Sequence, residues 1–272
     1  MLRKDGSEAR YTEWEPKPGA RQQIMNLLLP IATSFSREEC LDLPPAVYQI
    51  RDAEASPEQR KIFRQLMTGL AIEYAEGNLT SANVLNKSSK LRQACGGFIY
   101  LKDGDERSIH VFKKNPKLDL LEELYEETGY KIVVWHEFVE EGRIIEAWAQ
   151  RKGIQYASLR GEIKDKDEQE RRFIEDPNIQ LMIAHPKCAS ESNDFSGCQV
   201  TFYYSTGGSV IQRLQTEGRT RRKNQTRRQL FVDAVITGSA DEVTTQRMND
   251  DKQMEQSMLE YIRTFGKSET HK

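Results

Sequence analysis

Alternating strand and helix patterns over residues 109–236 constrain the fold of this chain more than any other feature. Ile132–Trp135 is a continuous apolar run, as expected of a strand buried on both faces. The segment from Asn115 to Gly129 has the spacing and the end residues of a helix. Further strand patterns lie at Ile109–Phe112, Tyr156–Leu159, Ile179–Ala184, Val200–Tyr204 and Gln229–Ile236. The alternation predicts an α/β fold in which an open parallel sheet carries helices on both faces.

The residues before this alternation have a different pattern. Arg21–Ser34 predicts a helix that ends near Pro30, and Val47–Ala53 alternates like a strand. Ser56 followed by Pro57 is typical of a helix start, with a serine N-cap and a proline at the first helical position. We therefore expect three parts: a mainly helical segment with few sheet contacts at residues 1–112, the sheet domain at residues 113–240, and a charged helix and tail at residues 241–272.

Composition and charge exclude several classes of protein. The 272 residues include 40 basic and 42 acidic side chains, so any nucleic-acid footprint must be a local patch. The four cysteines form no C-x-x-C pair and no histidine lies beside them, which disfavours a zinc site or a disulfide framework. The longest apolar stretch, Ile24–Ile31, is too short to span a bilayer. We expect a cytoplasmic protein with no membrane partner and no metal ligands of its own.

A basic motif near the end of the domain carries the strongest chemical signal. Its pattern is Q-x-x-G-R-x-x-R-x-x-Q, formed by Gln215, Gly218, Arg219, Arg222 and Gln225. Two arginines three residues apart lie on one face of a helix end, and each has a planar fork suited to phosphate oxygens. Glycine at the fourth position leaves that side of the helix without a side chain. The alternative is a solvated basic helix end, because charge runs usually face solvent.

This motif and an ordered series of shorter segments resemble the second RecA-like lobe of Swi/Snf-type superfamily 2 helicases and DNA translocases. The motif is similar to the sixth motif of that superfamily, with every defining position filled. The other matching segments run in family order, at Cys40–Pro45, Ser56–Lys61, Lys90–Cys95, Lys117–Leu118, Lys131–Phe138, Ser158–Gly161, Glu168–Phe173 and Gly238–Glu242. The detailed sequence, including Trp14–Gly19, looks most like compact bacteriophage members of the family.

The resemblance implies a function and a set of site residues. ATP and Mg²⁺ would lie between two lobes and be held mainly by a first lobe, which the chain lacks. This chain would supply arginines to the transferring phosphoryl group, an effect worth roughly 10³–10⁵ in rate. Its partners would be DNA and that first lobe. The implied residues are Arg219 and Arg222 as catalytic groups, Gln215 and Gly218 at the nucleotide, and His136, Arg160, Lys187, Ser190 and Gln225 at nucleic acid.

The loop at Pro186–Phe195 departs from the family pattern. Ser190 and Ser192 stand where the fifth motif usually has glycines, and Asp194 stands where asparagine is usual. The acidic residues of this loop would weaken phosphate binding, which puts its coupling to DNA in doubt. Alternatively, the serine hydroxyls and backbone donors still serve a phosphate and the loop simply differs.

The sequence contains no phosphate-binding G-x-x-x-x-G-K-[ST] motif and no D-E-x-H box. Gly266-Lys267-Ser268 does not qualify, because Tyr261 occupies the position of the first glycine. Two explanations are open: the chain is the C-terminal portion of a longer enzyme, which we favour, or it is a separately encoded partner. A non-enzymatic module that docks DNA or protein through its basic stretch is the alternative function.

Four aromatic residues have competing interpretations. Trp135 and Trp148 fit core positions better than DNA-stacking positions, because both lie within apolar patterns. His136 and His185 each follow a strand at the edge where open α/β sheets bind ligands, so a turn role and a backbone-contacting role are both open for His136.

Overall fold

The computed structural model describes residues 17–28, 43–76, 81–103, 106–189, 193–222 and 225–248. The chain divides into two units. Helix α1 (Ala20–Leu28) is the described part of the first unit, and it covers the start of the helix predicted at Arg21–Ser34. Everything described from residue 43 onward belongs to the second unit, which contains the sheet. Trp14 and the tail beyond residue 248 lie outside the described residues.

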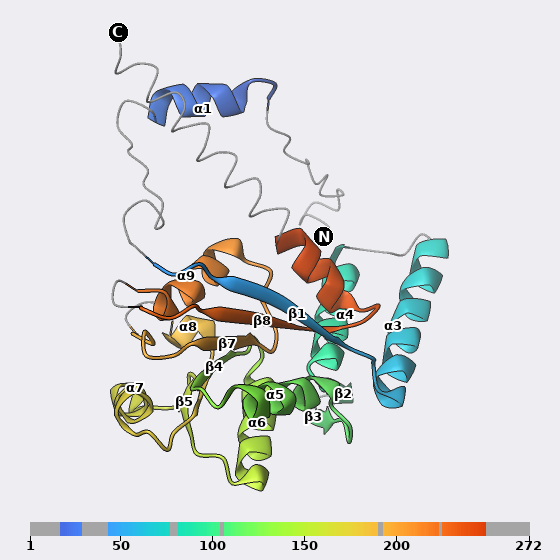
Figure 1. Ribbon diagram of the computed structural model, residues 1–272. Coiled ribbons are helices and arrows are strands. Elements are labelled where there is room, and N and C mark those ends of the chain that lie inside the picture. Colours follow the sequence, from blue (N-terminus) through green and yellow to red (C-terminus); the bar gives the residue numbers. More distant parts are fainter. Residues whose placement is uncertain are drawn as a thin grey trace. The chain divides into compact units, whose positions relative to one another are not determined.

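A six-stranded parallel sheet forms the centre of the second unit (Figure 1). Its strand order is β1-β8-β7-β4-β6-β5, and each neighbouring pair is parallel. The bounds are β1 (Val47–Ala53), β4 (Ile132–Trp135), β5 (Tyr156–Leu159), β6 (Leu181–Ala184), β7 (Val200–Tyr203) and β8 (Leu230–Ile236). The predicted parallel-sheet fold is therefore confirmed.

Alternate residues of the buried strands pack into two separate cores, one on each face of the sheet. Ile132 and Val134 join the core beneath α5 (Pro116–Thr128) and α6 (Val139–Lys152). Val133 and Trp135 join the core beneath α7 (Lys166–Glu175) and α8 (Pro186–Ala189). Because side chains alternate across a strand, a continuous apolar run supplies both cores, and helices cover both faces as predicted.

Strand β1 corrects the expectation that residues before 113 would make few sheet contacts. Val47–Ala53 is the strand that its alternation predicted, but it pairs with all seven residues of β8 at the edge of the sheet. Tyr48 also stacks on Phe231, with ring centroids 5.2 Å apart. The expectation was wrong because a parallel ladder joins segments far apart in sequence, which local pattern does not reveal. The predicted boundary between residues 112 and 113 is therefore not the edge of the sheet.

Two helices and a hairpin follow β1 and precede α5 in the chain. Helix α3 (Pro57–Ala75) begins as predicted: the Gln59 backbone N–H donates to Ser56 Oγ, and the Ser56 N–H donates to Gln59 Oε1 at 2.8 Å. This reciprocal pair is a capping box. Helix α4 (Ser81–Cys95) and the antiparallel hairpin of β2 (Phe98–Asp103) and β3 (Glu106–Val111) follow.

Left-handed glycines end the two helices of the first core. Gly129 (φ 61°) follows α5 and Gly153 (φ 70°) follows α6, a conformation that glycine adopts without steric cost. The predicted core positions of Trp135 and Trp148 are confirmed, since both side chains are buried. No helix in the described part of the chain has the length and apolar character that crossing a bilayer requires.

Candidate inter-lobe and nucleic-acid site

Helix α9 (Val210–Thr220) presents the basic motif and ends just before its second arginine. The helix begins at Ser209, whose side chain accepts a hydrogen bond from the Gln212 backbone N–H at 3.3 Å. One face of α9 is buried against the sheet through Arg213, Thr216, Glu217 and Thr220. Gln215 is exposed and Gly218 is half-buried. The two predicted nucleotide-side residues thus lie away from the face that packs on the sheet.

The structure brings the two predicted catalytic arginines together with the end of the fifth-motif loop. The Phe195 N–H donates to the carbonyl oxygen of Arg219 at 2.9 Å. Arg222 donates through Nη2 to the carbonyl oxygen of Asn193 at 3.1 Å, and its Nε lies 3.6 Å from Asp194 Oδ1. The Arg222 side chain is 37% exposed, so it is anchored yet accessible. Predicted Ser190 lies outside the described residues.

The Gln225 side chain makes hydrogen bonds that hold the domain's own backbone together. Its side chain is buried, and Nε2 donates to the carbonyl oxygens of Thr220 at 2.8 Å, Ser196 and Cys198. These bonds close the turn after α9 against the start of β7. A side chain with its donors committed to buried carbonyls is not available to a phosphate, so the geometry gives no support to the predicted nucleic-acid contact.

His136 is also buried, at the carboxyl end of β4. Its side chain has no solvent exposure, and Nδ1 lies 2.9 Å from the carbonyl oxygen of Phe138. A carbonyl can only accept, so Nδ1 carries the proton. Gly142 on α6 leaves room for the ring, since a Cβ there would lie 2.8 Å from His136 Nε2. Burial lowers the pKa of His136 to about 3. The geometry gives no support to a DNA contact by this buried ring.

Arg160 and Lys187, the other two predicted nucleic-acid residues that the structure describes, differ in their ion pairs and in their exposure. Arg160 is held by carboxylates: Nη2 lies 2.7 Å from Glu146, and Nη1 lies 2.7 Å from Glu162. Lys187, in the short helix α8 that follows β6, is exposed. Of the predicted nucleic-acid residues that the structure describes, Lys187 has the environment best suited to a DNA phosphate.

Metal-ligating side chains do not converge among the described residues. No group of three or more histidine, cysteine, aspartate or glutamate side chains is placed to hold a metal ion there. Cys95, Cys188 and Cys198 are free thiols, and burial raises the pKa of Cys95 and of Cys198 to about 12.

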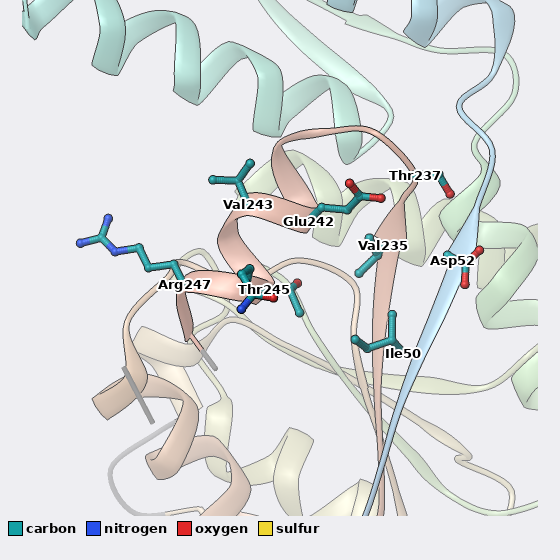
Figure 2. Close-up of a pocket in the computed structure, with 9 residues that line it drawn as sticks. Ile50, Asp52, Val235, Thr237, Glu242, Val243, Thr245 and Arg247 are labelled. Atoms are coloured by element: carbon teal, nitrogen blue, oxygen red, sulfur yellow. The ribbon is translucent and has the colours of Figure 1, made fainter. Parts of the chain in front are cut away.

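An open pocket of about 840 Å³ lies beside the two strands at the edge of the sheet, β1 and β8 (Figure 2). The carboxyl-terminal halves of β1 and β8 line it through Ile50, Asp52 and Val235. The C-terminal helix, residues 240–248, closes one side with Val243 and Arg247. None of the predicted site residues lines this pocket.

Sequence reasoning missed two buried charge clusters. Lys117 is fully buried, lies 2.8 Å from Asp241 and donates to the carbonyl oxygen of Tyr204 at 2.7 Å. Arg213 is 3% exposed and pairs with Glu217 and Asp233. The helical spacing of α9 could have revealed the second cluster. It places Arg213 and Glu217 on the same face as the small residues Thr216 and Thr220, which is the face that packs on the sheet.

Residues 116–224 match the family described as the helicase conserved C-terminal domain. The fold is RecA-like. It is similar to the C-terminal part of the Fun30 ATPase domain, with a TM-score of 0.64 and 14% identity over 76% of this chain and 89% of that one. It is also similar to the C-terminal domain of the Sulfolobus solfataricus SWI2/SNF2 ATPase, with a TM-score of 0.56 and 16% identity over 76% of this chain and 86% of that one.

The solved SWI2/SNF2 ATPase cores extend well beyond the matched part. The Sulfolobus solfataricus SWI2/SNF2 ATPase core in complex with dsDNA gives a TM-score of 0.60 and 19% identity, over 84% of this chain and 49% of that one. The part of that core that this chain matches is thus about half of its length. Comparison with curated protein sequences gives no significant match.

Proposed function

We propose that this chain is the second lobe of a DNA-dependent ATPase of the Swi/Snf type. Arg219 and Arg222 would stabilise the charge on the γ-phosphoryl group of ATP, with Gln215 and Gly218 alongside. A first lobe would hold ATP and Mg²⁺. Lys187, with Arg160 and the loop at Ser190, would form part of a DNA track. The family match at residues 116–224 supports this assignment. A cytoplasmic location and a bacteriophage-type enzyme belong to the same proposal.

One observation carries the proposal: the sixth-motif arginines and the fifth-motif loop meet on a partly exposed surface. Arg222 contacts Asn193 and lies near Asp194 from the loop, and its guanidinium keeps access to solvent. An arginine held in this way can move a short distance to a phosphate when the first lobe closes on this one. Because the charge would meet the γ-phosphate mostly in the closed state, it would stabilise the transition state more than the ground state.

The test is DNA-stimulated ATPase activity of a protein in which a first lobe precedes this chain. The chain alone is expected to give no turnover, since its sequence has no phosphate-binding loop. In the two-lobe protein, Arg222→Ala should lower kcat on the order of a hundredfold or more, with little change in KM for ATP. Arg222→Lys should rescue little, because an ammonium lacks the planar fork.

Arg228→Ala is the matched control, because Arg228 is exposed and lies outside the motif positions. Arg221 is unsuitable as a control because it is buried. Near-normal turnover by Arg222→Ala would refute the arginine-finger role. DNA binding without ATPase activity in any two-lobe protein would favour the non-enzymatic alternative.

A further inference from the structure

We propose that Arg213 and Glu217 are positioning residues, which fix the rotation of α9 on the sheet and so aim Arg219 and Arg222. The inference rests on the proposed function for its catalytic consequence. Neither residue is at a defined position of the Q-x-x-G-R-x-x-R-x-x-Q pattern. Their side chains belong to one connected network of hydrogen bonds.

The network ties one helix to three strands. Arg213 Nε donates to Glu217 Oε1 at 2.7 Å, one helical turn along α9. Its two terminal nitrogens donate to the two carboxylate oxygens of Asp233 in β8, one of them at 3.0 Å. The guanidinium carbon lies 3.4 Å from the ring centroid of Tyr203 in β7. The second oxygen of Glu217 accepts from the hydroxyl of Tyr48 in β1 at 3.0 Å.

These contacts are directional, and the two residues of α9 that make them are shielded from water. The Arg213 and Glu217 side chains are 3% and 5% exposed, so solvent competes little for their hydrogen bonds. A bidentate arginine–carboxylate pair fixes geometry as well as contributing energy, because two parallel bonds form together. Burial, and then the Glu217 carboxylate, raise the pKa of Tyr48 to about 12, so its hydroxyl stays a donor at neutral pH. The network therefore favours one rotation of α9.

The rotation of α9 determines where the catalytic arginines point. Glu217 precedes Arg219 by two residues, and Arg222 follows the end of the helix. A side-chain tip lies roughly 5–6 Å from a helix axis, so a rotation of about 20° moves it by about 2 Å. A displacement of about 1 Å can cost a hundredfold in rate. A modest loosening of α9 would therefore misplace both arginines without unfolding the domain.

The first measurement uses this chain as it is. Arg213→Lys keeps the charge but loses the planar fork and its stacking on Tyr203. Amide hydrogen exchange over residues 210–220 should become at least about tenfold faster, while exchange in β4 and β6 stays within about twofold. Tyr48→Phe is the milder second variant, because it removes one hydroxyl from a half-exposed ring, and it should speed the same amides several-fold.

The second measurement uses the two-lobe protein. Arg213→Lys should lower kcat roughly ten- to a hundredfold while KM for ATP changes less than about threefold. Tyr48→Phe should lower kcat several-fold with an unchanged Tm, which a purely stabilising role would not produce. Arg143→Lys is the matched control, since Arg143 on α6 pairs with Glu140 and Glu162, and all three lie far along the chain from α9. It should alter neither readout.

Three outcomes decide the inference. Unchanged exchange over residues 210–220 in both variants overturns it at the structural step. Faster exchange with normal kcat overturns it at the catalytic step, leaving the network a stabilising one. If the unaltered two-lobe protein shows no ATPase activity, the proposed function fails, and the exchange data alone then decide whether the network sets the rotation of α9.

Discussion

Acid should destabilise this domain through His136, and the size of the effect follows from its burial. The ring has no solvent exposure, and within the described structure its Nε2 has no hydrogen-bond partner. Protonation would give Nε2 an N–H group beside Gly142, and within the described structure that group would have no hydrogen-bond acceptor. Burial accordingly lowers the pKa of His136 from 6.5 to about 3. In the unfolded chain the same ring takes up a proton near its ordinary pKa.

The direction and the magnitude follow from this difference. Below pH 6.5 the unfolded state binds one more proton than the native state, so the free energy of unfolding falls as pH falls. Each pH unit costs about 1.4 kcal/mol, which gives about 2 kcal/mol by pH 5. The full loss, near pH 3, is about 5 kcal/mol. His136→Gln removes the titrating ring. The free energy of unfolding of this variant should therefore change with pH by about 1.4 kcal/mol less per pH unit over this window than that of the unaltered protein.

Urea unfolding at several pH values between 5 and 7.5 measures this difference directly. The unaltered protein and His136→Gln are compared by the slope of unfolding free energy against pH. Gly142→Ala is the control: it crowds the ring, so it should lower stability at every pH while the slope stays that of the unaltered protein. Equal slopes for His136→Gln and the unaltered protein would refute the assignment of the acid sensitivity to this ring.

Two further predictions concern stability and DNA. Asp241→Ala should cost about 3 kcal/mol or more in urea unfolding, because it leaves the fully buried Lys117 ammonium without its carboxylate. Adding Lys117→Met should recover part of that loss, and a loss below about 1 kcal/mol for Asp241→Ala would contradict the reasoning. The chain should bind duplex DNA weakly and without sequence preference, and Lys187→Ala should reduce the salt slope by about one. Tight binding that persists at high salt would argue against this footprint.

Local sequence signals were sufficient for most of the sheet. Ile132–Trp135 and Tyr156–Leu159 are strands with the predicted bounds, because a short apolar run between turn residues has few other stable conformations. The helix start at Ser56 could be predicted because its capping residues are adjacent in sequence. The place of β1 in the sheet could not, since each of its residues pairs with a residue of β8 that lies 183 positions further along the chain. The helix at Ser81–Cys95 was missed because polar residues dominate its sequence.

Sequence could predict where the motif arginines lie in the fold, but it could not predict the side-chain environments that tertiary contacts determine. Spacing placed Arg219 and Arg222 at the end of a helix, and the structure places them beside the fifth-motif loop. The burial of His136 depends on a glycine six residues later in the next helix. The hydrogen bonds of the Gln225 side chain depend on carbonyl groups that only the fold brings close to it. Neither side-chain environment is visible in local sequence.

Strand β1 also determines where a stable fragment of this chain can begin. A fragment that starts at residue 113 would lose β1 and leave β8 as an uncovered edge of seven residues. That edge carries Phe231 and Val232 among its apolar side chains and would offer a full row of unpaired backbone groups. Long apolar edges of this kind recruit strands from other molecules. Such a fragment should self-associate more than one that begins ahead of Val47, in which β1 covers β8 and is itself the edge strand.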